Sequence, residues 1–272
     1  MCAHGRPAVA VFAVALAELA GTVDAEAAAL AADLGTSAYD ARLLLAAGLP
    51  ALVRTTPDRA QALDLLARLR GRGHRAVACD AAAVVSSGAM VAMRRFRLED
   101  GAVALDGDEA ALPYGDIVAL IAAVHRRRTD TESRTQESKF SMSRALLTSG
   151  LSMTKTVTTR AHTSSEEREG VLYAFRRSGA TPWILREHGT AWGSLGPAVA
   201  ATESENFRRA VTALRERAPG AAFDERLVTR KASGRAAVSG GAGATTVTTS
   251  SDAAIDLLAH LLALWLARAA PR

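Results

Sequence analysis

Residues 34–80 read LGTSAYDARLLLAAGLPALVRTTPDRAQALDLLARLRGRGHRAVACD, and their pattern predicts the fold of the first part of the chain. Ser37 can cap a helix, because its hydroxyl accepts a hydrogen bond from one of the first backbone N–H groups. Apolar residues then recur at helical spacing as far as Gly48, which fits a left-handed helix end. Pro50 prevents further helix, and a short strand is predicted over 51–54.

The second half of this stretch predicts another helix and another strand. Thr56 and Pro57 are a start signal, a capping hydroxyl followed by proline at the first helical position. Leucine and alanine then share one helical face until Gly71 and Gly73. The alternation of polar and apolar residues over 75–79 indicates a strand.

This order of elements resembles the C-terminal domain of the bacterial ribosomal stalk protein. The matching features are Leu34-Gly35, a helix ending at Ala47-Gly48, the turn at Pro50 into a strand, and an alanine- and leucine-rich helix ending at Gly71. With a first strand at 9–14, the resemblance covers 9–80 and implies a small sheet with helices on one face. In that family the helix after the Leu-Gly pair is rich in lysine and recruits translation factors. Here residues 36–40 read TSAYD, so the ribosomal function is not carried over.

Length, composition and net charge limit the class of protein to which this chain can belong. The chain has 272 residues, which suits one large domain or two small ones. It is rich in alanine and contains a single asparagine, a composition that suggests a GC-rich genome. Its formal net charge is +5, which is compatible with an anionic partner or with a solvated surface of basic bias.

Neither the cysteines nor the apolar segments indicate a metal site, a disulfide framework or a membrane span. The two cysteines, Cys2 and Cys79, form no Cys-x-x-Cys motif. The apolar start over 1–21 has no clear charged lead and contains Glu18, so we expect no signal peptide. No run approaches the ~20 apolar residues of a transmembrane helix. We therefore expect a cytoplasmic protein.

A second, β-rich domain is predicted over 87–230. Strands are expected over 90–98, 102–105, 118–124, 171–175, 182–186 and 223–228, with further strands over 139–160. Periodicity leaves 118–124 open between strand and helix, and the neighbouring hairpins favour strand. The polar segments near 125–138 and over 161–169 are predicted to be exposed loops, the first of them a loop or disordered insertion.

Several strands closed by one amphipathic helix resemble the plan of a pleckstrin-homology-like barrel. The resemblance is architectural, and the polar insertion near 125–138 departs from the simplest version of that plan. In that family the last helix plugs one end of a bent sheet. The helix predicted over 204–217 would take that role here.

The end of the chain predicts a linker and an amphipathic helix. Residues 231–251 are mostly Gly, Ala, Ser and Thr, the composition of a flexible linker. Asp252 can cap a helix over 252–268 whose apolar surface cannot stand alone in water. The helix must dock on its own chain, on a partner or second copy, or on a membrane surface. As an interaction helix it would use Leu258, Leu261, Leu262 and Trp265.

No catalytic, cofactor-binding or metal-binding constellation is found in the sequence. His162 and Glu166 are four residues apart, but they lie in a polar, loop-like segment. Arginines near the predicted strand ends would form an anion-binding patch if the strands bring them together. These are Arg94, Arg95, Arg126, Arg127, Arg128, Arg176 and Arg177.

Together these patterns predict an α+β protein, a small α/β sandwich over 1–82 followed by a mostly antiparallel β domain closed by a helix. The predicted function is that of a non-enzymatic protein-binding or adaptor module without a cofactor, and its partner is unknown. One alternative is a binder of anionic surfaces, either lipid headgroups or nucleic acid, through clustered arginines. Another is an enzyme whose site is assembled from distant residues.

Overall fold

The computed structural model describes residues 10–107, 110–140, 154–230, 235–241 and 244–269. The chain is α+β, as expected. It divides into two compact units. The first, which we call the body, comprises 1–125, 169–233 and 252–272, and the second, the ribbon unit, comprises 126–168 and 234–251.

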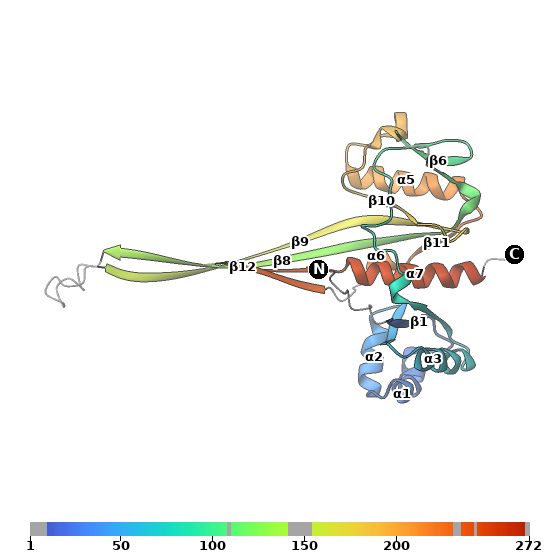
Figure 1. The fold of residues 1–272 in the computed structure, drawn as a ribbon, viewed down its shortest axis with the longest axis horizontal. Coiled ribbons are helices and arrows are strands. Elements are labelled where there is room, and N and C mark those ends of the chain that lie inside the picture. The colour runs from blue at the N-terminus through green and yellow to red at the C-terminus, as the bar shows by residue number, and fades with distance from the viewer. Residues whose placement is uncertain (1–9, 108–109, 141–153, 231–234, 242–243, 270–272) are drawn as a thin grey trace, which may run out of the picture. The chain divides into compact units, whose positions relative to one another are not determined.

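The body begins with a three-stranded antiparallel sheet in the order β2-β1-β3. Its elements are β1 (Phe12–Glu18), α1 (Val23–Leu34), α2 (Ala38–Ala46), β2 (Ala51–Thr56), α3 (Arg59–Gly71) and β3 (Arg75–Asp80). The three helices cover one face of the sheet and enclose a core that includes Leu16, Leu30 and Leu65 (Figure 1). The helices and strands predicted for 34–80 are therefore present.

Two boundaries in this part differ from the prediction. The first strand occupies 12–18 rather than 9–14, because β1 is the central strand and is buried on both faces, which removes the alternation that would mark its ends. Helix α3 is capped by Asp58, whose carboxylate accepts hydrogen bonds from the N–H groups of Ala60 and Gln61. Thr56 instead ends β2 and is buried.

Helix α7 (Asp252–Ala269) covers the other face of this sheet. Leu261 packs on Ala13, Ala15 and Val77. The opposite side of α7 packs against a second sheet, so the helix forms a layer between two sheets of the body (Figure 1). Of the docking alternatives for this helix, the structure shows the one on its own chain.

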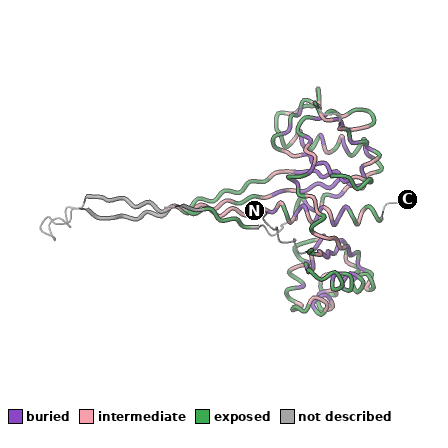
Figure 2. Tube along the Cα trace, in the orientation of Figure 1, coloured by how far each residue is buried: buried purple, intermediate pink, exposed green. Residues whose placement is uncertain are grey.

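The second sheet of the body is built on two long strands, β8 (Ile117–Phe140) and β9 (Thr154–Arg176), which also enter the ribbon unit. In the body its order is β8-β9-β10-β4, with β10 (Trp183–Arg186) and β4 (Val91–Ala92), and β11 (Ala222–Glu225) is parallel to β8. Residues 171–175 form a strand, as predicted, and the structure shows them buried on both faces (Figure 2).

Alternate residues of this strand enter different cores. Leu172 and Ala174 face the core of helix α5 (Glu203–Arg217), whereas Val171 and Tyr173 face α7. Helix α5 closes its side of the sheet with Phe207, Ala210 and Leu214, and its N-cap is Thr202. A small antiparallel sheet of β5 (Phe96–Leu98), β6 (Ala102–Leu105) and β7 (Ala111–Pro113) completes this core.

Two predicted strands of this region are shorter than expected. The strand expected over 90–98 is interrupted between β4 and β5, which belong to different sheets. The strand expected over 223–228 ends at Glu225 and is followed by the short helix α6 (Arg226–Thr229). Three 3-10 segments, Ala81–Ala83, Tyr114–Asp116 and Trp192–Ala198, lie between the other elements.

The ribbon unit overturns three predictions. The segments 125–138 and 161–169 lie in β8 and β9, and most of the predicted linker 231–251 is the hairpin of β12 (Arg235–Gly241) and β13 (Ala244–Ser250). Polarity indicated loops, but a strand that faces water on both sides is polar too, and threonine favours strands. Residues 231–234 and 242–243 of the predicted linker lie outside the described residues, as do residues 141–153 of the strands predicted over 139–160 and Cys2.

Candidate functional site

The arginines expected to form an anion-binding patch do not converge in the body. Arg94 and Arg95 follow β4, in which Ala92 pairs with Ile184, so they lie toward the Arg186 end of β10. Arg176 lies near the Trp183 end of β10, because Ala174 pairs with Trp183. The two groups therefore occupy opposite ends of one strand.

Several of these arginines are already paired with acids. Arg176 donates a hydrogen bond to Asp116 at 2.7 Å, and the N–H group of Arg177 binds the Asp116 carbonyl. In the ribbon unit, Arg128 binds Asp130 at 2.9 Å. Arg126 lies 3.6 Å from Glu166, and Arg127 follows it in β8. A phosphate would have to compete with these carboxylates.

The residues expected to form an interaction helix are mostly buried in the body. Leu258, Leu261 and Leu262 are at most 4% exposed. Trp265 is half-buried, and the Arg226 guanidinium lies 5.0 Å from the centre of its ring. The three leucines belong to an internal layer of the body, so they are not open to a partner.

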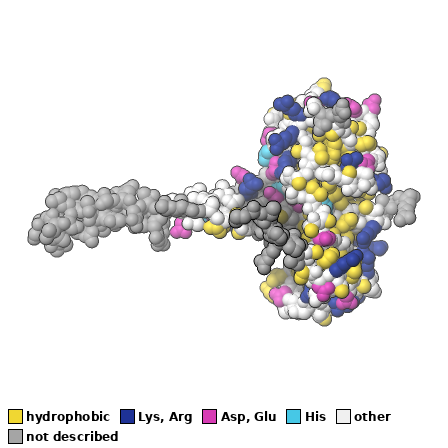
Figure 3. All heavy atoms as spheres, in the orientation of Figure 1, with side chains coloured by type: hydrophobic (Ala, Val, Ile, Leu, Met, Phe, Trp, Pro, Cys, Tyr) yellow, Lys and Arg dark blue, Asp and Glu magenta, His cyan; other side chains and the backbone are white. Residues whose placement is uncertain are grey.

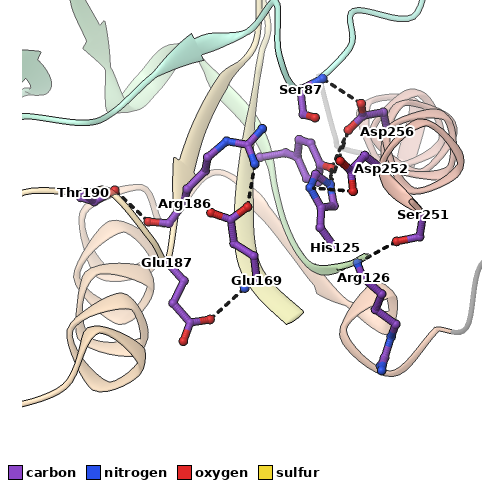
Figure 4. Close-up of polar contacts among 12 residues, drawn as sticks. Ser87, His125, Arg126, Glu169, Arg186, Glu187, Thr190, Ser251, Asp252 and Asp256 are labelled. Atoms are coloured by element: carbon purple, nitrogen blue, oxygen red, sulfur yellow. Dashed lines mark hydrogen bonds and ion pairs between the residues drawn. The ribbon is translucent and has the colours of Figure 1, made fainter. Parts of the chain in front are cut away.

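A buried polar network that the sequence did not predict fixes α7 to the second sheet (Figure 4). Asp256 of α7 accepts hydrogen bonds from the Tyr173 hydroxyl at 2.7 Å and from the Ser87 N–H group at 2.8 Å. His125 of β8 lies with its Nε2 2.6 Å from the Tyr173 oxygen. Because the Tyr173 proton is directed at Asp256, His125 Nε2–H must be the donor to the tyrosine oxygen.

The electrostatics of this network stabilise a charged carboxylate beside a neutral phenol. Burial disfavours the ionised form of Asp256, but the surrounding groups, His125 first among them, outweigh it and lower the pKa of this carboxyl. Burial and the charge of Asp256 raise the pKa of Tyr173 well above its usual value. Burial lowers the pKa of His260, whose Nε2 accepts a hydrogen bond from the Val85 N–H group.

The network is better suited to holding the helix than to catalysis. His125, Tyr173 and Asp256 are each at most 4% exposed, so a substrate has no direct approach to them. Within the described residues, no cluster of three His, Cys, Asp or Glu side chains could hold a metal ion. Burial also raises the pKa of the free Cys79 thiol to about 11, which disfavours a reactive thiolate.

The ribbon unit is the second unusual feature. β8 has 24 residues and β9 has 23, whereas strands of globular proteins usually have 3–10. The strand order within this unit is β12-β13-β8-β9, and β13 pairs with residues 127–133 of β8. Ser251 continues the pairing of β13 with β8 beyond the pair Ser250–Arg127. Its hydroxyl accepts a hydrogen bond from the Arg126 N–H group, and its own N–H group donates one to the Arg126 carbonyl.

The β9 edge of this ribbon, like the β12 edge opposite, has no partner strand in the described part of the chain. β9 pairs with β10 only over residues 171–174, so residues 154–168 have β8 on one side alone. Residues 161–168 are all exposed. No described residue of the ribbon unit belongs to a buried hydrophobic cluster.

Comparison with known proteins adds no further indication of function, because no family model, characterised protein or solved structure matches this chain. Of the helices that the structure describes, none has the length and apolar content needed to cross a membrane.

Proposed function

We propose that this chain is a non-enzymatic protein-binding protein, an adaptor, whose docking element is the ribbon unit. The observation that carries the proposal is the edge of β9 over residues 154–168, which lacks a partner strand among the described residues. Such an edge presents backbone N–H and C=O groups at regular spacing. It is a template on which another protein can add a strand.

The energetics of the ribbon unit support a bound state. A narrow antiparallel ribbon is at best marginally stable in water unless one of its faces is buried. The ribbon contributes nothing to the buried hydrophobic clusters of the described chain, and its Val238 is 70% exposed. A partner strand would satisfy backbone groups along the edge and bury part of its surface.

Local charge pairing favours a specific partner over unselective strand pairing. Along the ribbon, Arg168 binds Glu166 at 2.9 Å and Arg128 binds Asp130 at 2.9 Å. Charged side chains on an edge discourage pairing with arbitrary strands. A partner must therefore present complementary charges as well as an extended segment.

The proposal is tested with a shortened ribbon. Residues 134–160 are replaced by Asn-Gly, a two-residue hairpin turn that leaves the segment of β8 paired with β13 in place. Full-length and shortened proteins are used to capture partners from the native lysate after crosslinking. We expect a partner that is captured by the full-length protein and lost with the shortened one, while the thermal midpoint of the body is unchanged.

A matched control separates the ribbon from general surface charge. The variant Arg94→Gln/Arg95→Gln removes two exposed charges of the body and leaves the ribbon intact. It should capture the same partner as the full-length protein. Undiminished capture of that partner by the shortened protein, which keeps only residues 161–168 of the proposed edge, would overturn the proposal.

A further inference from the structure

A basic pocket that no sequence motif indicates lies in the body. It is an open cavity of about 680 Å³ between the C-terminal ends of α3 and α7 and the beginning of β3. Its charged lining comprises Arg70, Arg75 and Arg268 against one carboxylate, Glu18. Figure 3 shows Lys and Arg side chains gathered on the surface beside the C-terminal end of α7.

Arg70 is held in a fixed orientation at this pocket. Its Nε and Nη2 groups both donate to the Ala76 carbonyl, each at 3.0 Å. Its Nη1 group has no hydrogen-bond partner among the described residues. Burial, followed by the nearby charge of Arg268, lowers the pKa of Arg70, which places the two cations close together.

The other two arginines have no counter-ion in the described chain. Neither Arg75 nor Arg268 forms an ion pair with a described carboxylate, and both are exposed. Arginines near the ends of α3 and α7 complement the helix dipoles. Arg75 begins a strand, so that explanation does not extend to it.

His74 and Trp265, which also line the pocket, are held in place by contacts with residues outside it. The Nδ1 atom of His74 accepts a hydrogen bond from the Ala20 N–H group, and its Nε2 lies 3.2 Å from Glu26. His74 is therefore occupied and closes the pocket without offering a catalytic base. Trp265 lines the pocket and is held by the Arg226 guanidinium, so it provides a flat apolar wall.

We propose that this pocket binds a phosphate-bearing ligand through Arg70, Arg75 and Arg268. Guanidinium groups match the geometry of phosphate oxygens and remain charged at any physiological pH. Three cations facing one carboxylate repel one another, and a bound polyanion would remove this repulsion. The phosphate could be carried by a free small molecule or by a lipid headgroup, since both present the same chemistry.

The test uses the full-length protein with inorganic pyrophosphate as the probe. The variant Arg75→Gln/Arg268→Gln is compared with Arg94→Gln/Arg95→Gln, which removes the same charge from exposed positions elsewhere in the body. Calorimetric titration and thermal unfolding are measured at constant ionic strength with chloride as the reference. We expect pyrophosphate to raise the thermal midpoint of wild type and control by about 3 °C or more. For the pocket variant we expect affinity to fall at least about tenfold.

A second arm distinguishes the source of the phosphate. Vesicles of phosphatidylcholine with and without a phosphorylated phosphoinositide are sedimented with each protein. Phosphoinositide-dependent sedimentation that needs Arg75 and Arg268 assigns the site to a headgroup, and pyrophosphate binding alone assigns it to a small molecule. The proposal is overturned if wild type and pocket variant behave alike in both arms. It is also overturned if pyrophosphate leaves the thermal midpoint of wild type unchanged and the ligand-free pocket variant is less stable than the control, because the two arginines would then stabilise the fold rather than bind a ligand.

Discussion

Tyr173 donates a hydrogen bond to Asp256 across 2.7 Å and so joins the C-terminal part of β9, which lies in the body, to helix α7. Both residues are at most 2% exposed. β9 continues from this point into the ribbon unit, and α7 is the layer between the two sheets of the body. This bond therefore fixes the part of β9 that lies in the body to helix α7.

The first prediction concerns the carboxylate of this pair. Asp256→Ala should lower the free energy of unfolding by about 3 kcal/mol, because the buried Tyr173 hydroxyl and Ser87 N–H group lose their acceptor. Urea denaturation at pH 7 measures the change. The control is Asp64→Ala, which removes an exposed i,i+4 ion pair with Arg68 and should cost less than about 0.5 kcal/mol. Equal effects of the two substitutions would contradict a structural role for the network.

The second prediction concerns pH. Because the pKa of His260 is lowered in the folded state, the unfolded chain binds a proton first as the pH falls below the ordinary value of 6.5. Stability is therefore lost as the pH falls from 6.5 toward the folded pKa. The lowered pKa of Asp256 acts in the same direction at more acidic pH, below its ordinary value of 3.8.

Urea denaturation at pH 7 and pH 5 checks this prediction. His260→Gln should show a smaller difference between the two pH values than wild type, since glutamine does not titrate. An unchanged difference would mean that His260 is not the group responsible.

The third prediction concerns the close approach of β9 to its neighbours. A Cβ atom at Gly170 would lie 2.8 Å from Oε2 of Glu187 and 3.0 Å from Cε1 of Phe207. Gly170→Ala should therefore lower stability by about 1–3 kcal/mol. At Gly115 nothing lies within 4 Å of the added atom, so Gly115→Ala is the matched control and should be tolerated. Thermal unfolding of both variants measures the change in stability. If Gly170→Ala lowered stability no more than Gly115→Ala, the close contacts of Gly170 with Glu187 and Phe207 would be contradicted.

The fourth prediction concerns the position of α7 between the sheets. Leu261 is 0% exposed, whereas Leu264 on the same helix is 39% exposed. Leu261→Ala should cost about 2–5 kcal/mol through the lost burial and the cavity left behind, and Leu264→Ala should cost less than about 1 kcal/mol. If the two substitutions had similar effects on denaturation, α7 would not be a buried layer.

The sequence predicted local elements better than their assembly. Ser37 caps α2 as expected, because capping depends on a few neighbouring residues. The network of His125, Tyr173 and Asp256 draws on three distant segments, so no spacing in the sequence could indicate it. No spacing indicated the basic pocket either, since Arg70 and Arg268 come from distant segments of the chain.

The ribbon did leave a signal that polarity obscured. Residues 116–149 and 151–169 contain no glycine or proline, which is unusual for long loops but typical of long strands. The resemblances to a ribosomal stalk domain and to a pleckstrin-homology-like barrel remain predictions, because no solved structure matches the chain.

The most direct test of the proposed docking mode is hydrogen–deuterium exchange on the full-length protein with and without its captured partner. Strand addition should slow exchange of the backbone amides of residues 154–168 of β9, while those of 171–175, already buried in the body, stay as slow as before. Protection confined to the body, with no change along 154–168, would contradict the ribbon as the docking element.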